Sequence, residues 1–319
     1  MIKKEKKHVH IPGTNMSLLD EGAFLWAGSM LLSLLLSTAT PAKSSNRTQE
    51  KPLRVALIGF GAINSEVGRA IQEGSHGLEK RRVKLVKVLV RTKGDGRQAD
   101  IFTTSFEDLM EAQPDIIVEA AGQPSIRQYG AKILSNCDVL LTSIGALTDD
   151  SVLSSLVSVA EKAGTKIHLA SGAMPALDWM HASSLGGGDA QSVEVEQRKP
   201  PKSWLGACLK GDALDFNSLT EDATVFEGNA REAASLFPKN ANVSAMLGLS
   251  TVGLDKCSVK LVAALGDFGT TVKYSGEAGS LEVKTKGKQS RTNPRTSAVV
   301  PLAVIKAIKN MTSVVVIGA

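Results

Sequence analysis

The feature that most constrains the fold is a regular alternation of short apolar runs with longer amphipathic stretches across residues 53–173. The intervening stretches carry apolar residues at helical spacing. Short strands that alternate with helices of about 10–15 residues are typical of a parallel sheet wound in βα units. We therefore predict an α/β fold with a doubly wound parallel sheet. The expected strands are 54–60, 83–91, 115–121, 138–146 and 166–173, and the expected helices are 63–72, 125–134 and 149–163.

The turn after the first expected strand reads IGFGAIN and has the spacing of a dinucleotide-binding loop. Gly59 permits a tight turn, and Gly61 lets backbone N–H groups approach a pyrophosphate at the start of the next helix, where Ala62 and Ile63 complete the expected site. The third glycine of such loops is replaced by Asn64, which adds bulk between helix and strand but leaves the phosphate site open. We predict that NAD or NADP binds here. The alternative is a structural turn in a domain that binds something else.

The end of the second expected strand bears on the type of cofactor. An acidic residue there would bond a ribose 2′-hydroxyl and disfavour a 2′-phosphate. This chain has Arg91 instead, within the sequence VRTK. Arg91 can pair with a phosphate, so we expect NADP to be accepted. The alternative is that Arg91 is a solvated charge at a strand end.

Beyond residue 173 the pattern becomes mostly strand-like, with alternation around a GEAG turn that predicts a hairpin over 270–287. Further strands are expected at 192–200 and 257–266, and helices at 229–236 and 241–252. These elements predict a second domain with a mostly antiparallel sheet. The predicted domains are an N-terminal extension (1–50), a dinucleotide-binding domain (51–175), an α+β substrate and dimerisation domain (176–292) and a C-terminal helix that returns to the first domain (293–319).

The role of the N-terminal extension stays open. A basic start and the uncharged segment 23–42 resemble a signal peptide or a membrane anchor. However, Asp20 and Glu21 directly precede the apolar segment, and the basic cluster lies far upstream. A non-native extension or a misassigned start codon is the other interpretation. We expect a cytoplasmic protein by default, with secretion or membrane anchoring as the alternative if 23–42 is functional.

Composition narrows the set of partners. The chain has a formal charge of +5 and only 4% aromatic residues, and no Lys/Arg cluster is interleaved with aromatics. We therefore expect no nucleic-acid partner, whereas a small anionic substrate fits this balance. The three cysteines are widely spaced, so they offer neither a disulfide framework nor a metal site.

Several longer blocks are similar to the L-aspartate dehydrogenase family, and the similarity covers residues 53–310. They read EAAGQPSIRQYGAKIL, TSIGALTD, LASGAMPALD, QRKPPKSWLG, FEGNAREAASLFPKNANVSAMLGLSTVGLD and NPRTSAVV. The resemblance implies a Rossmann-type domain with an α+β substrate domain, in a homodimer. It also implies interconversion of L-aspartate with iminoaspartate and oxaloacetate using NAD or NADP, an activity that can feed NAD biosynthesis.

The resemblance also suggests site residues. Ala173, in the sequence SGA, and Asn242, in KNAN, match cofactor positions of the family. The alternative for Asn242 is a cap at a helix start. Lys199, in QRKPP, and Arg295, in NPRTS, are cations that can hold the substrate carboxylates. The alternative for both is a surface charge.

The chain departs from the family at its catalytic residue. The family has a histidine just before the hairpin turn, and the corresponding residue here is Thr270. Threonine has no useful pKa for transferring the proton that amine oxidation releases. No histidine follows His181 in the chain. Three residues are candidates for the missing group: His181, Asp178 and Lys199.

Three interpretations follow from this departure. The first, which we favour, is an NAD(P)-dependent L-aspartate dehydrogenase with an altered acid/base group. The second is a catalytically impaired, cofactor-binding homologue, or one acting on another substrate. The third is a non-enzymatic sensor or partner-binding protein that keeps the fold.

Overall fold

The structure is a computed structural model, and Lys51–Ala319 forms one compact unit in it. The described residues are 51–92, 100–188, 191–204, 216–238, 240, 242–290, 293 and 296–318. The predictions for the extension, including segment 23–42, therefore lie outside the described part. Among the described residues, no helix is long and apolar enough to cross a membrane.

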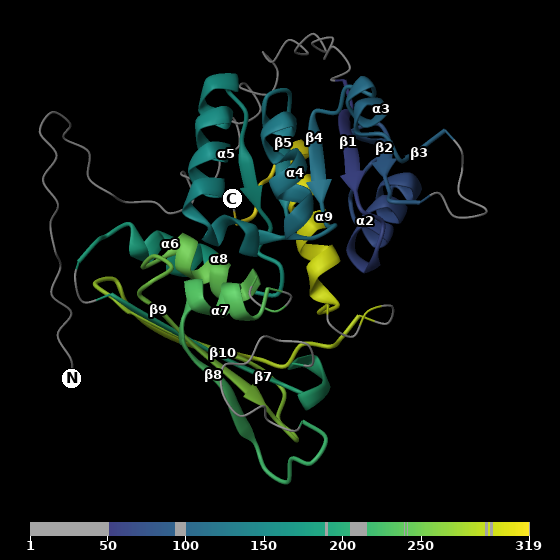
Figure 1. The fold of residues 1–319 in the computed structure, drawn as a ribbon. Helices are drawn as coiled ribbons and strands as arrows, with labels where there is room; N and C mark the ends of the chain where they lie inside the picture. Colours follow the sequence, from purple (N-terminus) through teal and green to yellow (C-terminus); the bar gives the residue numbers. More distant parts are fainter. Residues whose placement is uncertain are drawn as a thin grey trace, which may run out of the picture. The chain divides into compact units, whose positions relative to one another are not determined.

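The first sheet has six parallel strands in the order β3-β2-β1-β4-β5-β6 (Figure 1). This order is that of the Rossmann fold, so the predicted fold class is confirmed. The strands are β1 (Leu53–Ile58), β2 (Val83–Leu89), β3 (Phe102–Thr103), β4 (Ile116–Glu119), β5 (Asp138–Leu141) and β6 (Ile167–Leu169).

Helices cover both faces of this sheet (Figure 1). One face packs on α2 (Ala62–Glu73) and α9 (Val299–Thr312), which also contact each other. The other face packs on α3 (Phe106–Glu111), α4 (Gln123–Leu134) and α5 (Asp150–Ala163). The sheet is therefore a buried central layer whose strand ends remain free to form a site.

The second sheet has five strands in the order β11-β10-β7-β9-β8. It is mostly antiparallel, as predicted, with one parallel pair, β7–β9. The strands are β7 (Ser192–Lys199), β8 (Ala223–Asn229), β9 (Cys257–Ala263), β10 (Gly269–Gly276) and β11 (Gly279–Thr285).

One face of the second sheet is covered by helices, and we call it the inner face. It packs on α6 (Leu177–Ser184), α7 (Ala230–Leu236) and α8 (Asn242–Ser250), and on the 3₁₀ helix η2 (Pro201–Trp204). Alternation puts Val193 and Val195 of β7 on this face, opposite Tyr274 and Val272 of β10. In Figure 1 the three helices lie between the two sheets. The inner face therefore looks toward the first sheet.

Some elements differ from the sequence prediction. β3 and α3 were not expected, because β3 has only two residues and α3 only six. The expected strand 138–146 ends at Leu141, and the 3₁₀ helix η1 (Ile144–Thr148) follows it. Residues 144–147 are all buried, and a short buried apolar run fits a strand or a helix equally well.

Candidate functional site

The glycine loop connects β1 to α2 at the carboxyl edge of the first sheet. Gly59 has a φ of +81°, which favours glycine, and a Cβ atom there would lie 2.9 Å from the Ala120 carbonyl oxygen and 2.9 Å from the Ala121 Cβ. The neighbouring end of β4 therefore presses directly against Gly59. A side chain at this position would push the two strand ends apart.

Gly61 forms the N-cap of α2, and its surroundings suit an anion. A Cβ atom at Gly61 would meet nothing within 4 Å, so the backbone is open to an approaching group. No side chain caps the helix, and its first turn holds no acidic residue. Ala62 and Ile63 are the first two residues of α2. A helix N-terminus with open backbone N–H groups fits a pyrophosphate, and the assignment of these residues to the cofactor stays a prediction.

Asn64 does more than fill the place of the third glycine. Its side chain is 0% exposed, and its Nδ2 donates hydrogen bonds to three carbonyl oxygens, those of Ile58 (3.1 Å), Gly59 (3.0 Å) and Val118 (3.2 Å). These bonds tie α2 to the ends of β1 and β4. The loop therefore keeps its shape through a side chain where glycine-only loops depend on close backbone packing.

Arg91 follows β2 at the same edge of the sheet, and its side chain is exposed. Among the described residues, no carboxylate pairs with it. Parallel strands present their carboxyl ends at one edge, so Arg91 lies on the same side as the glycine loop. The pairing of Arg91 with a 2′-phosphate stays a prediction.

Glu119 is a buried acid that sequence reasoning missed. It ends β4 and is 0% exposed. Its Oε1 accepts hydrogen bonds from the backbone N–H of Ala121 (2.7 Å) and Gly122 (2.8 Å) and from the Ser143 hydroxyl (3.1 Å). Burial raises the pKa of this carboxyl group, although these bonds oppose the shift. Glu119 shapes the turn that leads into α4, and its only sequence signal is an acid at the end of an apolar run.

Asn242 links the carboxyl edge of β5 to the second sheet. It begins α8, and its Oδ1 accepts a hydrogen bond from the backbone N–H of Gly145 in η1 at 3.0 Å. Ala173 lies in the partly buried turn after β6, the strand next to β5. The structure therefore places both predicted cofactor residues along the carboxyl edge of β5 and β6.

The inner face of the second sheet turns polar at one end, and we call this row of residues the polar end. Thr270 of β10 pairs with Gln197 of β7 on one side and with Thr285 of β11 on the other. Lys199 lies two residues beyond Gln197, on the same face. Gln197 is 2% exposed, and its Oε1 has no hydrogen-bond partner among the described residues.

Lys199 is the charged group of this polar end. Its Nζ donates a hydrogen bond to the Asn240 Oδ1 at 3.2 Å and lies 5.3 Å from the ring centroid of Trp204. Within the described part of the chain, no carboxylate lies within 4.0 Å of the ammonium group. Burial lowers its pKa to about 8. Asn240 is two residues from Asn242, so the polar end lies next to the cofactor edge.

The loop before Thr270 is held in place from both sides. Asp267 has a φ of +50°, and its carboxylate pairs with the Nζ of Lys284 (2.8 Å) and of Lys286 (2.7 Å) on the β11 side. Its backbone carbonyl accepts a hydrogen bond from the Arg198 Nε at 3.3 Å. The two ammonium groups lower the pKa of Asp267 to about 2. These contacts fix the register in which Thr270 joins β10.

His181 lies away from the polar end. Its Nδ1 is 2.7 Å from the carbonyl oxygen of Ser250, at the last residue of α8, whereas Asn242 is the first. Nine helical residues span about 12 Å, so His181 sits one helix length from the cofactor edge. Arg295 lies outside the described residues. The structure thus brings together Thr270 and Lys199 but not His181.

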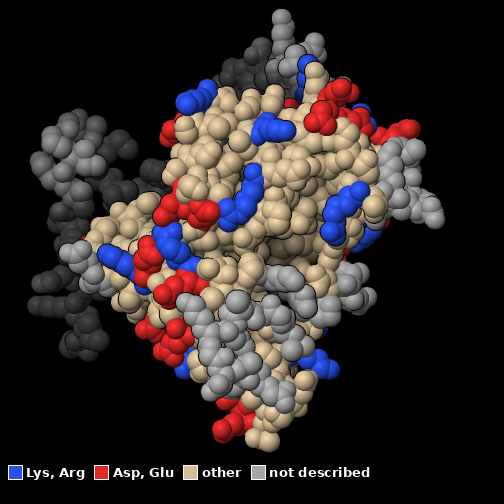
Figure 2. Space-filling model, viewed as in Figure 1, with Lys and Arg blue, Asp and Glu red and all other residues tan. Residues whose placement is uncertain are grey.

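An arginine cluster joins the two sheets beside this site. Arg231 of α7 pairs with Asp255, donates to the Thr148 carbonyl oxygen at 2.7 Å and pairs with Asp150 at 3.0 Å. Arg127 of α4 pairs with Asp149 at 2.8 Å. Figure 2 shows acidic and basic side chains gathered where α5 and α7 meet. These ion pairs hold the second sheet against the start of α5.

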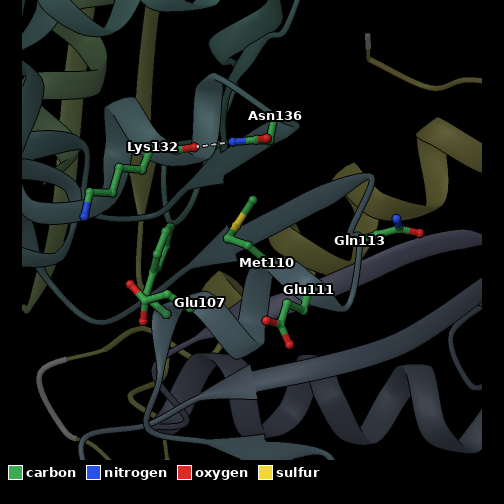
Figure 3. A pocket seen from close by; sticks show the side chains of 7 residues that line it. Glu107, Met110, Glu111, Gln113, Lys132 and Asn136 are labelled. Atoms are coloured by element: carbon green, nitrogen blue, oxygen red, sulfur yellow. Dashed lines mark hydrogen bonds between the residues drawn. The ribbon is translucent and has the colours of Figure 1, made fainter.

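One surface hollow lies elsewhere. It has a volume of about 660 Å³ and is open to solvent between α3 and α4 (Figure 3). Glu107 and Met110 of α3 line it, with Lys132 and Asn136 at the end of α4. The Asn136 Nδ2 donates to the Lys132 carbonyl oxygen at 2.9 Å. The ends of α3 and α4 lie opposite the carboxyl edge, so this hollow is remote from the glycine loop.

Two protein-family models match the chain, one in each half of the described residues. Residues 59–170 match the family model described as "Homoserine dehydrogenase, NAD binding domain". Residues 178–311 match the model described as "Aspartate dehydrogenase, C-terminal". The first match contains the glycine loop, and the second contains the polar end.

Relatives and solved structures agree with these matches. The L-aspartate dehydrogenase of Cupriavidus necator is 33% identical, covering 81% of this chain and 97% of its own length. That of Pseudomonas aeruginosa is 37% identical over 62% of this chain and 74% of its own. The crystal structure of aspartate dehydrogenase from Thermotoga maritima shares the fold with a TM-score of 0.62 and 24% identity, covering 83% of this chain and 99% of that one. The chain belongs to the L-aspartate dehydrogenase family of NAD(P)-dependent oxidoreductases.

Proposed function

We propose that this protein oxidises L-aspartate to iminoaspartate with NAD or NADP, and that water then converts iminoaspartate into oxaloacetate and ammonia. One observation carries the proposal. In a chain of this family, the first sheet carries a glycine loop with an open start of α2, and the polar end of the second sheet lies beside the loop after β5 at the same edge of that sheet. The loop from Phe237 to Asn242 connects them, because Asn240 bonds Lys199 and Asn242 bonds Gly145.

The first sheet supplies the cofactor side of the site. Gly59 and Gly61 bring the start of α2 close to the pyrophosphate, and Arg91 pairs with the 2′-phosphate of NADP. Ala173 and Asn242 line the nicotinamide end. A nicotinamide held by these residues would supply the acceptor for the hydride from the substrate Cα. The residues present fit a nicotinamide dinucleotide. A Cβ atom at Gly61 would meet nothing within 4 Å, so the backbone there is open to the pyrophosphate.

The second sheet supplies the substrate side. L-Aspartate carries two carboxylates and one ammonium group at neutral pH. We assign a carboxylate to Arg295 and place Lys199 in contact with the reacting end of the substrate. The unpartnered Gln197 Oε1 is an acceptor for a substrate N–H.

The remaining assignments are predictions from the sequence pattern and from the family resemblance. They are a homodimer, a cytoplasmic location and a supply of iminoaspartate to NAD biosynthesis. The division of residues 51–319 into a cofactor domain, a substrate domain and a returning helix at residues 175/176 and 292/293 belongs with them.

Reductive amination tests the proposed function. The full chain is given oxaloacetate, ammonia and NADPH or NADH, and loss of reduced-nicotinamide absorbance is followed together with formation of L-aspartate. We expect one aspartate for each cofactor oxidised. Pyruvate, which has one carboxylate, and 2-oxoglutarate, whose two carboxylates are one carbon further apart than those of oxaloacetate, serve as controls. Turnover with either at a rate equal to that with oxaloacetate contradicts the assignment of the substrate.

A further inference from the structure

Oxidation of an amine needs a group that accepts a proton, and the polar end offers one such group among the described residues. The substrate ammonium must lose a proton before its Cα–H bond can leave as hydride. Thr270, at the position of the family histidine, cannot take that proton at neutral pH, and neither can Gln197 or Thr285. Lys199 can, once its amine is uncharged.

The register of the second sheet puts Lys199 close to the position of the missing histidine. Thr270 lies directly opposite Gln197, and Lys199 is two residues further along β7 on the same face. Diagonal neighbours of this kind lie about 7–8 Å apart, a gap that a lysine side chain spans. The hydrogen bond to the Asn240 Oδ1 turns its Nζ toward the loop that carries Asn242.

We propose that Lys199 is the catalytic acid/base of this enzyme, taking the place of the family histidine that is absent at Thr270. The inference rests on the proposed function. In the forward direction, the Lys199 Nζ lone pair takes a proton from the substrate ammonium and becomes an ammonium itself. The Cα–H bond breaks, its electron pair leaves as hydride to the cofactor, and the nitrogen lone pair forms the C=N bond. Water adds to this carbon, and ammonia departs.

The surroundings of Lys199 allow it to release and accept a proton. The elements packed around its side chain present Ala263 of β9, Trp204 of η2 and Asn240, none of which is charged at neutral pH. The charged neighbours on its own strand, Glu196 and Arg198, lie on the opposite face of the sheet.

Among other lysines nearby, Lys202 of η2 is exposed, and Lys239 lies outside the described residues. Burial is the cause of the lowered Lys199 pKa, about 8, and no carboxylate counteracts it within the described part. A lysine with this pKa is partly uncharged just above neutral pH.

The other candidates for this role are less well placed. His181 bonds the Ser250 carbonyl oxygen at the far end of α8. Asp178, three residues earlier on α6, is exposed. Trp179 of the same helix packs edge-on against Tyr274, four residues and about 13 Å along β10 from Thr270. Helix α6 therefore covers the opposite end of β10.

The test separates a proton-transfer role from simple attraction of a carboxylate. Lys199→Arg keeps the positive charge but cannot act as a base at neutral pH. Lys199→Ala removes the group and leaves space for a small amine. Lys202→Arg, three residues away and exposed, is the matched control. Binding of NADPH, followed by its fluorescence, shows that each variant is folded and retains its cofactor site.

We expect kcat for L-aspartate to fall by about 10²–10⁴-fold in both Lys199→Arg and Lys199→Ala, with NADPH affinity within threefold of the wild type. Ethylamine or methylamine should restore part of the Lys199→Ala activity. Wild-type kcat/KM should rise with pH through about 8, and this rise should be absent in Lys199→Arg. Lys202→Arg should match the wild type throughout.

Two results would overturn the inference in distinguishable ways. If the wild type is active and Lys199→Arg retains kcat within threefold, with only KM changed, Lys199 merely binds a carboxylate. If the wild type binds NADPH but does not turn over aspartate at any pH, the proposed function fails, and this inference fails with it.

Discussion

The two sheets hold their buried polar groups in different ways. At the carboxyl edge of the first sheet, the Asn64 Nδ2 and the Glu119 Oε1 each make three hydrogen bonds to neighbouring backbone or hydroxyl groups, while the Asn64 Oδ1 and the Glu119 Oε2 are buried without a partner among the described residues. At the polar end of the second sheet, the Gln197 Oε1 makes none within the described residues. Lys199 there makes one hydrogen bond and no ion pair with a described carboxylate.

Both sides leave a buried polar atom without a partner, but on the cofactor side the same side chains are anchored by three hydrogen bonds each. An unpaired buried polar group costs about 1–3 kcal/mol, which a ligand recovers if it supplies the missing partner. We infer that the cofactor side keeps its shape unaided, whereas the substrate side is completed by aspartate. Changes on the cofactor side should therefore reduce folding stability, and changes on the substrate side should reduce catalysis alone.

Gly59→Ala should have the largest effect on folding. The left-handed backbone costs a non-glycine residue about 1–2 kcal/mol, and the contact with the end of β4 adds about 1–3 kcal/mol. We expect the free energy of unfolding in urea to fall by about 3–4 kcal/mol, with weaker NADPH binding. Gly164→Ala, at a φ of +70° with nothing within 4 Å, is the control and should lose only the backbone cost. Equal losses in the two variants would disprove the role of the strand contact.

Asn64→Ala comes next. It removes three hydrogen bonds and leaves buried carbonyl oxygens of β1 and β4 without this donor, so the free energy of unfolding should fall by about 2 kcal/mol. Urea denaturation measures this loss, and NADPH titration should show weaker binding. Asn64→Gly restores the usual glycine of such loops and should recover affinity better than alanine does. Unchanged stability in Asn64→Ala would remove the contrast between the two sheets.

Gln197→Met tests the substrate side with a side chain of similar length. We expect KM for aspartate to rise about tenfold while the free energy of unfolding stays unchanged or increases, because an unpaired buried amide is replaced by an apolar group. Steady-state kinetics and urea denaturation measure the two effects. Glu196→Gln, on the opposite face of β7, is the control for kinetics. A loss of stability above about 1 kcal/mol would show that Gln197 already has a partner in the fold.

Arg91→Ala should have the smallest effect. An exposed cation contributes about 1 kcal/mol to a phosphate contact, so NADPH affinity should fall about fivefold and NADH affinity should not change. Fluorescence titration with both cofactors measures the difference. A parallel loss for both cofactors would place Arg91 away from the 2′-phosphate.

The sequence predicts the cofactor side well because its signals are local. A strand, two glycines and a helix lie within twenty residues, and the backbone requirement at Gly59 is visible in the sequence itself. The bonds of Asn64 are not visible there, because their acceptors include Val118 on another strand, 54 residues away. Sequence reasoning treated Asn64 only as added bulk.

The substrate side is harder to predict because its residues meet through sheet register. In SVEVEQRK, Gln197 and Lys199 occupy the alternate positions that Val193 and Val195 occupy earlier in the strand. A polar residue at a position expected to be buried was therefore the one sign in the sequence that Gln197 is special. Their proximity to Thr270 depends on the pairing of β7 with β10, 73 residues apart at Gln197 and Thr270. The placement of His181 likewise follows from the packing of α6 on α8, which no local pattern encodes.

The central claim is that this family member is an active aspartate dehydrogenase although threonine occupies the histidine position. The direct test is aspartate-dependent reduction of NAD⁺ and NADP⁺ by the full-length wild type, beside Thr270→His. We predict clear wild-type turnover, with the histidine variant within tenfold of it. A wild type that binds NADPH but is silent, and gains turnover only through Thr270→His, would contradict the account and identify a catalytically disabled homologue.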